Sequence, residues 1–228
     1  MGERGVFLQV RIGSSRLPEK ALLTLAGKTV IEHAMEGLAA VEAEQFWLLT
    51  DEESEPQLRE LARGCGFRVY VGDSRNVLKR YCDAAAATGV EIIVRATGDN
   101  PLVSATMANR ALELQKSTGA DYAGITGPPL GTGVEILRST ALQDLLGRTS
   151  DPWELEHVSP GLYRNPQRYR VETRAVEREL DCPSFRVTLD TREDFQTLQA
   201  LYSELYRGSP LDLQDVVAYG REQKKDIA

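Results

Sequence analysis

A short loop near the N-terminus collects side chains suited to binding a polyanion. The apolar run from Val6 to Val10 predicts a short buried strand, and the loop follows it directly. Three cations, two hydroxyls and a glycine stand in this loop: Arg11, Gly13, Ser14, Ser15, Arg16 and Lys20. The cations would neutralise phosphate charge, and the glycine would let the backbone turn its N–H groups toward an oxyanion. Either a phosphate site or a solvated strand-to-helix connection with ordinary surface charges would have this composition.

The elements that would position this loop alternate between strand and helix over the first hundred residues. Strands are predicted at 6–10, 46–50, 67–71 and 90–96, and helices at 29–41, from about 51 to 64, and up to 87. Such alternation is typical of βαβ units, so we expect an α/β fold, a mainly parallel sheet with helices on both faces. Ligands of such sheets bind at the carboxyl ends of the strands. The loop after the first strand and the turn at 98–101 should therefore face one cleft.

The second half of the chain is less regular. Short strands are predicted at 121–125, 134–137, 169–175 and 185–189, and helices at 139–146, 153–163 and 192–206. A last packed segment at 210–219 precedes a polar tail at 221–228. We expect a single domain over residues 1–228, because no linker or repeat interrupts the chain.

Composition excludes several classes of protein. Hydrophobic residues make up 42% and charged residues 27%, as in soluble globular proteins. The net charge of −7 argues against nucleic acid and anionic membrane as partners, and no apolar run approaches the roughly 18 residues of a membrane span. The three cysteines show no CxxC spacing, which predicts reduced thiols in a cytoplasmic protein. The two histidines, His33 and His157, are too few for a histidine-rich metal site.

Several segments resemble, in order, the cytidylyltransferase family that contains CMP-KDO synthetase and the acylneuraminate cytidylyltransferases, and most of all its spore-coat polysaccharide biosynthesis branch. The matching segments are Gln9 to Lys20, Leu25 to Lys28, Arg95 to Pro101, Glu156 to Val158, Tyr163 to Pro166 and Val187 to Phe195. They cover nearly the whole chain. The resemblance implies a three-layer α/β/α, Rossmann-like fold of the nucleotide-diphospho-sugar transferase type. It also implies Mg²⁺-dependent transfer of CMP from CTP to a sugar acid or related acceptor, with release of pyrophosphate, for surface polysaccharide or glycan biosynthesis.

The resemblance assigns roles to individual residues. Arg16 and Lys20 would hold the β- and γ-phosphates, Arg11 would assist there or at the leaving group, and the loop residues Gly13, Ser14 and Ser15 would cradle the phosphate chain. Asp99 and Asp190 would hold Mg²⁺, which prefers hard oxygen ligands. Their alternative roles are a turn aspartate at position 99 and a helix cap, with Thr191, at position 190.

Three further residues are candidates for substrate contact. Arg80 would contact base or ribose, unless it lies on a solvated helix face, and Glu135 and His157 would touch the acceptor, unless they are structural. The choice of cytosine comes from the family alone. Glu19 stands where the family usually has glycine, and Gly133 where the branch often has aspartate.

Two rival functions stay open at the level of sequence. A nucleotide-sugar glycosyltransferase would share the fold but usually carries a D-x-D motif, which this chain lacks. A catalytically silent nucleotide-binding protein is the other rival, with Glu19 as the lesion. A P-loop kinase is disfavoured because GxxxxGK[ST] is absent.

Family members are commonly homodimers, and residues 163–185 are the predicted contact region.

Overall fold

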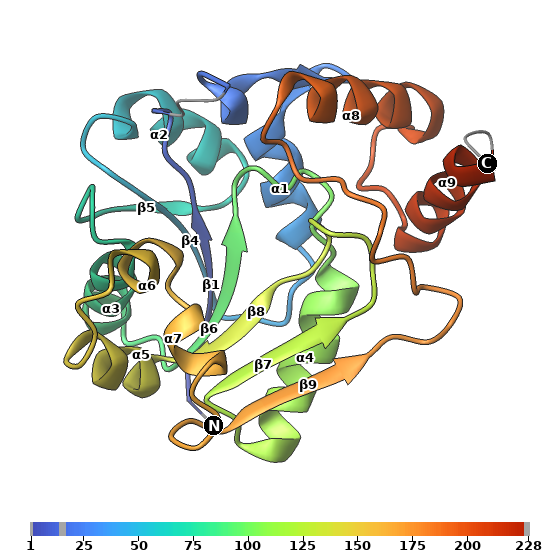
Figure 1. Cartoon of the computed structure of the whole chain (residues 1–228). Helices are drawn as coiled ribbons and strands as arrows, with labels where there is room; N and C mark the ends of the chain where they lie inside the picture. The colour runs from blue at the N-terminus through green and yellow to red at the C-terminus, as the bar shows by residue number, and fades with distance from the viewer. Residues whose placement is uncertain (1, 14–16, 226–228) are drawn as a thin grey trace.

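A seven-stranded sheet forms the centre of the computed structural model, which describes residues 2–13 and 17–225. Its strands are β1 (Arg4–Gln9), β4 (Gln45–Thr50), β5 (Arg68–Val71), β6 (Ile92–Thr97), β7 (Tyr122–Thr126), β8 (Glu135–Arg138) and β9 (Val171–Ala175). Their order is β5-β4-β1-β6-β8-β7-β9, and β8 runs antiparallel to both of its neighbours while the other pairings are parallel (Figure 1). The prediction of a mainly parallel sheet is confirmed.

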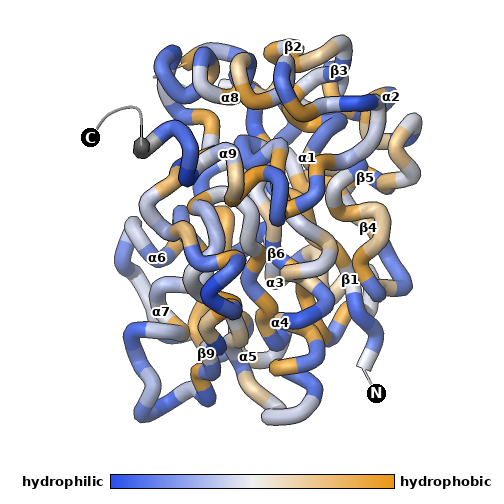
Figure 2. Tube along the Cα trace, turned by 90° about the vertical axis from the view of Figure 1, so that its right-hand side faces the viewer, coloured by the Kyte–Doolittle hydropathy of each residue, from blue (hydrophilic) through white to orange (hydrophobic). Residues whose placement is uncertain are grey.

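Helices cover both faces of the sheet, as the alternation of strand and helix predicted. They are α1 (Val30–Leu38), α2 (Glu55–Gly64), α3 (Val77–Thr88), α4 (Ala105–Thr118), α5 (Ser139–Leu146), α6 (Pro152–His157) and α7 (Pro160–Tyr163). Successive residues of β1 point to opposite faces, so Val6 and Leu8 pack in a core with α1, α2 and α4. Phe7 packs in a second core with α3, α5 and α7. Hydrophobic stretches of the chain lie between the helices, and hydrophilic stretches dominate the outer loops (Figure 2).

Local signals in the sequence explain where the helices begin and end. Thr29 caps α1 in a reciprocal capping box with Glu32, and the Asn76 side chain accepts a hydrogen bond from the Lys79 backbone at the start of α3. Gly89 ends α3 in the left-handed conformation. These caps fix the lengths of the helices and hence the positions at which the strands re-enter the sheet.

The C-terminal region forms a third core, built on α8 (Arg192–Leu205) and α9 (Leu213–Lys225). The prediction of a strand at 185–189 is wrong, since this segment makes only an isolated bridge between Leu130 and Arg186. The segment runs outside the sheet because its Phe185, Val187 and Leu189 are buried in the third core. The predicted polar tail is also partly wrong, because α9 continues to Lys225.

Three short elements follow the first loop: a 3₁₀ helix η1 (Lys20–Leu22) and a two-stranded hairpin of β2 (Thr24–Leu25) and β3 (Lys28–Thr29). The hairpin turns at Ala26 and Gly27, both at positive φ. His33 is buried beneath the hairpin, where its Nε2 lies 2.7 Å from the Leu25 carbonyl oxygen. All three cysteines are free, and none of the helices in the described ranges is long and apolar enough to cross a membrane.

Candidate active site

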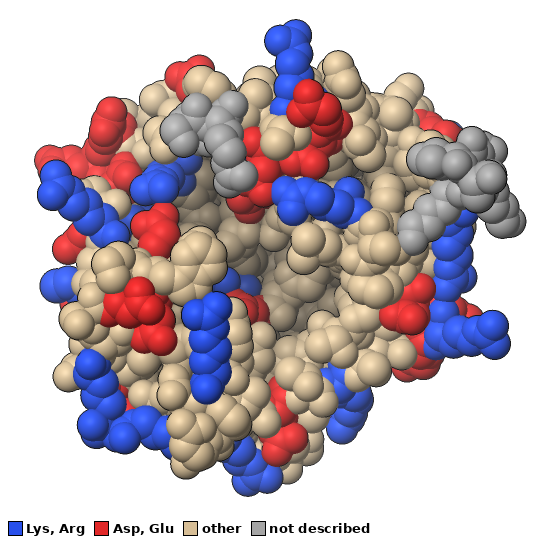
Figure 3. Space-filling model, viewed as in Figure 1, with Lys and Arg blue, Asp and Glu red and all other residues tan. Residues whose placement is uncertain are grey.

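The carboxyl ends of β1 and β6 open into a cavity of about 370 Å³. Gln9 to Arg11 and Thr97 to Asp99 lie side by side along its floor, and the Gly98 N–H donates to the Gln9 carbonyl at 2.8 Å. A Cβ at Gly98 would lie 2.8 Å from side-chain atoms of Val10 and Ile31, so only glycine permits this close approach. The face of the molecule in Figure 3 is hollowed near its centre, with acidic and basic side chains on its rim. For the described residues of the first loop, Arg11 and Lys20, the prediction that both loops face one cleft is confirmed.

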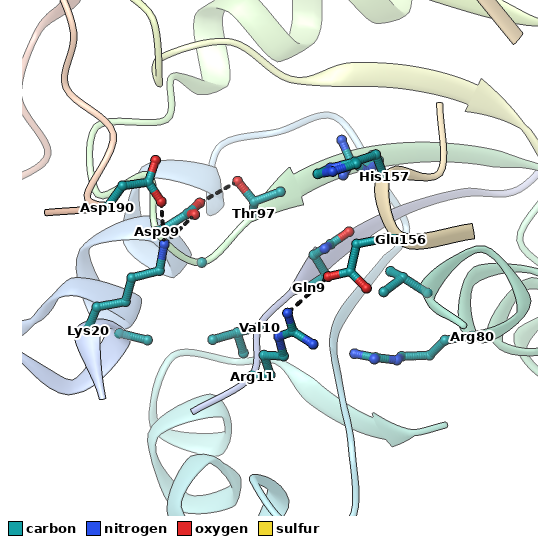
Figure 4. Close-up of a pocket in the computed structure, with 14 residues that line it drawn as sticks. Gln9, Val10, Arg11, Lys20, Arg80, Thr97, Asp99, Glu156, His157 and Asp190 are labelled. Carbon is teal, nitrogen blue, oxygen red and sulfur yellow. Dashed lines mark hydrogen bonds and ion pairs between the residues drawn. The ribbon is translucent and has the colours of Figure 1, made fainter. Parts of the chain in front are cut away.

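Lys20 joins the two predicted metal aspartates at one end of this cavity (Figure 4). Its Nζ lies 2.9 Å from Asp99 Oδ2 and 2.8 Å from Asp190 Oδ1. The sequence had suggested that Asp190 follows a strand of the sheet, which it does not. The two carboxylates nevertheless lie together at Lys20. The Leu189 N–H donates to the Asp99 carbonyl oxygen at 2.8 Å, which ties the segment before Asp190 to the turn after β6.

Other residues hold these carboxylates in place. The Thr97 hydroxyl donates to Asp99 Oδ1 at 2.7 Å, and Arg186 forms an ion pair with Asp190. The alternative role of helix cap belongs to Thr191, whose hydroxyl accepts from the Asp194 N–H at the start of α8. Asp190 therefore projects into the cavity, where both carboxylates line the wall.

The two carboxylates fit a Mg²⁺ ion better than a metal caged by protein alone. No group of three or more His, Cys, Asp and Glu side chains is placed to hold a metal within residues 2–13 and 17–225. Mg²⁺ commonly takes one or two carboxylates and completes its coordination with phosphate oxygens and water. The donor set of Asp99 and Asp190 matches that preference.

Arg80 lies toward the opposite end of the cavity from Lys20 (Figure 4). Only 2% of it is exposed, so the alternative of a solvated helix face is wrong. Its Nε donates to the Asp73 carbonyl at 2.9 Å, while its buried Nη2 has no hydrogen-bond partner among the described residues. A buried cation with an unused donor is costly unless a ligand pairs with it.

Arg11 lies between these two ends of the cavity and forms an ion pair with Glu156 of α6 at 3.0 Å. Half of the Arg11 side chain is exposed, so this pair contributes little to stability and is free to exchange partners. Arg11, a predicted phosphate ligand, thus faces the cavity, and a bound anion would displace its contact with Glu156.

The loop before Lys20 differs from its prediction in one respect. Ser14, Ser15 and Arg16 lie outside the described residues. Gly13 is not among the glycines at positive φ, and a Cβ there would meet nothing within 4 Å; the expected turn continues into residues 14–16 and stays a prediction. The left-handed residue is Glu19, with φ of 52°, directly before Lys20. A glycine at position 19 would adopt this conformation without strain.

A partly buried ion pair between Arg95 and Glu135 was not assigned a role from the sequence. The pair joins β6 to β8 across the sheet, and Ser159 donates to both Glu135 oxygens at 2.7 and 2.8 Å. The Tyr122 hydroxyl donates to Glu135 at 3.2 Å, and burial followed by the Glu135 charge raises the pKa of Tyr122. The antiparallel register of β6 and β8 places these charges opposite each other, and no local pattern of residues predicts that register.

His157 lines the same cavity as Arg80, whereas Glu135 lines a neighbouring one. The imidazole lies against the Trp153 ring with centroids 3.7 Å apart. Burial lowers the pKa of His157 below its ordinary value. The backbone turns sharply at the next residue, Val158, with φ of 71° and ψ of −65°, a strained γ-turn for a β-branched side chain. The two predicted acceptor residues, His157 and Glu135, thus line different cavities.

A charged cavity at the carboxyl edge of a mostly parallel sheet is the place where α/β proteins of this architecture bind their ligands. The family model described as cytidylyltransferase matches residues 6–219. The spore coat polysaccharide biosynthesis protein SpsF of Bacillus subtilis is 30% identical over 205 residues, which cover 86% of this chain and 85% of SpsF. The 3-deoxy-manno-octulosonate cytidylyltransferase of Coxiella burnetii is 36% identical over 103 residues, 43% of this chain and 40% of that protein.

Solved structures of proteins with related names have the same fold as this chain. A cytidylyltransferase from Leptospira borgpetersenii superposes with a TM-score of 0.91 at 25% identity, covering 99% of this chain and 96% of that one. A CMP-KDO synthetase complexed with CTP shares the fold, with a TM-score of 0.71 at 18% identity over 89% of this chain and 99% of that one. The chain belongs to the cytidylyltransferase family and is an enzyme of the nucleotidyltransferase class. The resemblance found in the sequence is confirmed.

Proposed function

We propose that the protein transfers CMP from CTP to a hydroxyl of a sugar-like acceptor, with release of pyrophosphate and with Mg²⁺ as cofactor. The observation that carries this proposal is the convergence of Lys20, Asp99 and Asp190 at one end of a cavity that holds Arg80 at the other. A nucleoside triphosphate needs a cavity whose two ends differ in this way. Its phosphates require cations and a metal site at one end, and its base requires selective hydrogen-bond donors at the other.

Each residue has a part in this proposal. Arg80 donates to the base or ribose through its unpaired Nη2, and Arg11 exchanges Glu156 for the phosphate chain. Lys20 moves its ammonium from the carboxylates to the β- and γ-phosphates, where Arg16 joins it. Gly13, Ser14 and Ser15 contribute backbone and hydroxyl donors. Alignment by these groups supplies much of the catalysis, since phosphoryl transfer depends mainly on positioning and charge stabilisation.

Asp99 and Asp190 would hold Mg²⁺, which offsets the charge on the phosphate oxygens when it is bound. In the reaction, the acceptor oxygen forms a bond to the α-phosphorus and the bond from that phosphorus to the bridging oxygen breaks. The hydroxyl proton leaves to solvent, and pyrophosphate carries away the electron pair. Thr97 keeps Asp99 oriented toward the cavity throughout.

The setting of the enzyme is also part of the proposal. We expect it to work in the cytoplasm in polysaccharide or glycan biosynthesis, as a single domain that pairs into a homodimer through residues 163–185. The exposed Tyr163 ring, which packs on Tyr122 at 5.5 Å between centroids, supports this contact region. Sedimentation as a monomer at micromolar concentration would exclude the dimer.

Pyrophosphate release in the presence of CTP, Mg²⁺ and a panel of sugars, sugar acids and sugar phosphates tests the reaction. We expect acceptor-dependent release that Asp99→Asn lowers by about 10²–10³-fold, as removal of one electrostatic catalytic group does elsewhere. Asp83→Asn, in a surface ion pair with Lys79, is the control and should keep its activity. CTP binding without release for any acceptor would favour a silent nucleotide-binding protein, and transfer from a nucleotide sugar would favour a glycosyltransferase.

A further inference from the structure

A strained turn joins α6 to α7 directly beside the nucleotide cavity. Its central residue, Val158, has φ of 71° and ψ of −65°, and the Ser159 N–H donates to the His157 carbonyl at 2.9 Å across it. A γ-turn with positive φ is rare because its backbone is strained. Such backbone persists only where the surrounding structure holds it, and it is concentrated at functional sites. The contacts that hold this turn therefore indicate its use.

The turn separates two residues of the cavity wall from two buried residues. Glu156 and His157, the last two residues of α6, line the nucleotide cavity, and Glu156 pairs with Arg11 there (Figure 4). Val158 is completely buried, and Ser159 is only 2% exposed. Because the chain changes direction within a single residue, the place of the His157 imidazole in the wall depends on how Ser159 is held.

Ser159 is held by Glu135 of β8. Its hydroxyl lies 2.7 and 2.8 Å from the two carboxylate oxygens of Glu135. A serine that precedes a helix ordinarily caps it by accepting a hydrogen bond from the helix backbone, but the Ser159 side chain makes no such bond with α7. The hydroxyl is donated to the carboxylate instead, and a hydrogen bond to an ionised acceptor is stronger than one between neutral groups.

Glu135 is in turn fixed by the sheet. It faces Arg95 in the register of β6 and β8 and forms an ion pair with it, and the Tyr122 hydroxyl donates to it at 3.2 Å. Only 22% of the Glu135 side chain is exposed. Separating two charges in such a place would leave each without its counter-charge, which is strongly unfavourable. The carboxylate is therefore a fixed point of the sheet to which the turn is tied.

We propose that Glu135 is a positioning residue that holds the γ-turn through Ser159 and so sets His157 in the wall of the nucleotide cavity. The inference rests on the proposed function for the reaction that this wall serves. The Val158 side chain packs in the second core and supports the same turn, while the hydrogen bond from Ser159 gives the turn its direction. Glu135 thus acts through the turn, in place of the acceptor contact that the resemblance suggested.

The titration of His157 reports where its imidazole lies. The chain has only two histidines, His33 and His157, so NMR resolves both imidazoles and His33→Gln assigns them. Burial lowers the pKa of His157. In Ser159→Ala the turn loses its contact with Glu135, the imidazole becomes hydrated, and the pKa of His157 should rise toward the ordinary 6.5.

Tyr122→Phe is the matched control. It removes the other hydroxyl that donates to Glu135 but leaves the turn untouched, so it reports any effect of a weakened ion pair with Arg95 on His157. The pKa of His157 should stay at its wild-type value in Tyr122→Phe. An unchanged pKa in Ser159→Ala, or an equal rise in both variants, would overturn the proposal.

Activity gives a second test, because a residue that acts through another shows non-additive effects. Ser159→Ala should lower kcat/KM for CTP at least about 5-fold in the otherwise wild-type enzyme, but less than about 2-fold in His157→Gln. A serine with a merely structural role would lower kcat/KM equally in both backgrounds. Equal losses, or no loss in either background, would overturn the proposal.

The two measurements separate this inference from the proposed function, because the histidine titration needs neither CTP nor an acceptor. If the pKa of His157 rises only in Ser159→Ala while no acceptor gives pyrophosphate release, the proposed function fails and the hold of Glu135 on the turn stands. If the wild type releases pyrophosphate and the pKa of His157 is the same in Ser159→Ala, the inference alone fails.

Discussion

The ammonium of Lys20 lies 2.9 Å from the Asp99 carboxylate, and it lies equally close to Asp190. One cation thus lies between two carboxylates whose residues are 91 positions apart in the chain. A divalent metal on the same two carboxylates would have to displace it, because the positive charges would repel each other. The released ammonium would then be available to the triphosphate, which links metal binding to nucleotide binding.

This relationship predicts that the protein without nucleotide binds metal weakly and that Lys20 is the reason. In Lys20→Met, Mn²⁺ should bind at least about 10-fold more tightly than in the wild type, measured by electron paramagnetic resonance without CTP. Lys28→Met, which removes a lysine paired with Glu36 away from the cavity, should leave Mn²⁺ affinity unchanged. Equal Mn²⁺ affinity in Lys20→Met and wild type would disprove the competition.

Arg80 should contribute to nucleotide affinity through its unpaired donor. A hydrogen bond that involves a charged group contributes roughly 1.5–3 kcal/mol, so Arg80→Met should weaken CTP binding about 10- to 100-fold by calorimetry. Arg80→Lys should not restore it, because an ammonium cannot reproduce the planar donor set. Arg59→Met, on the surface of α2, is the control. If Arg80→Met bound CTP as the wild type does, Arg80 would be purely structural.

Glu19 occupies a backbone conformation that costs a non-glycine residue roughly 1–2 kcal/mol. Glu19→Gly should therefore raise the free energy of unfolding by about 1 kcal/mol, once the greater chain entropy of glycine is subtracted. Glu19→Ala keeps the conformational strain but removes the charge, so it separates the two effects in urea unfolding. Both variants should bind CTP more tightly, because each removes an acid next to Lys20. A Glu19→Gly protein less stable than Glu19→Ala would contradict the strain argument.

His33 makes the stability depend on pH. Burial lowers its pKa below the ordinary 6.5, and its ring packs against the rings of Tyr202 and Tyr206. Below pH 6.5 the unfolded chain binds a proton that the folded chain resists, so stability falls as the pH drops below 6.5. The slope from this residue is at most about 1.4 kcal/mol per pH unit. Urea unfolding at pH 7.5 and 5.5 should show a smaller loss in His33→Gln, and an identical loss would contradict this origin.

Much of the fold could be predicted from local sequence patterns, namely hydrophobic periodicity and helix caps. The buried run at Val6–Val10 and the capped helices after it have the periodicity of βαβ units, and the structure has these elements at nearly the predicted residues. The segment 185–189 has the composition of a strand, yet it lies outside the sheet. Packing against α8 and α9 decides its place, and local sequence cannot report that contact.

The residues of the candidate site could be predicted where one segment of the chain carries several of them. They could not be predicted where their contact depends on which strands pair in the sheet. Lys20 and Asp99 stand in recognisable turns after strands. The ion pair of Arg95 with Glu135 depends on β8 entering the sheet antiparallel to β6, which no residue pattern revealed. The left-handed conformation of Glu19 was also missed, because a glutamate rarely adopts positive φ.

The position of a bound metal tests the central claim most directly. Crystals of the protein with Mn²⁺ and a non-hydrolysable CTP analogue would locate the metal by its anomalous scattering. We predict a Mn²⁺ peak at bonding distance from both Asp99 and Asp190, with Lys20 turned from the carboxylates to the phosphates. A metal bound elsewhere, with Lys20 still joined to both aspartates beneath the nucleotide, would contradict the account.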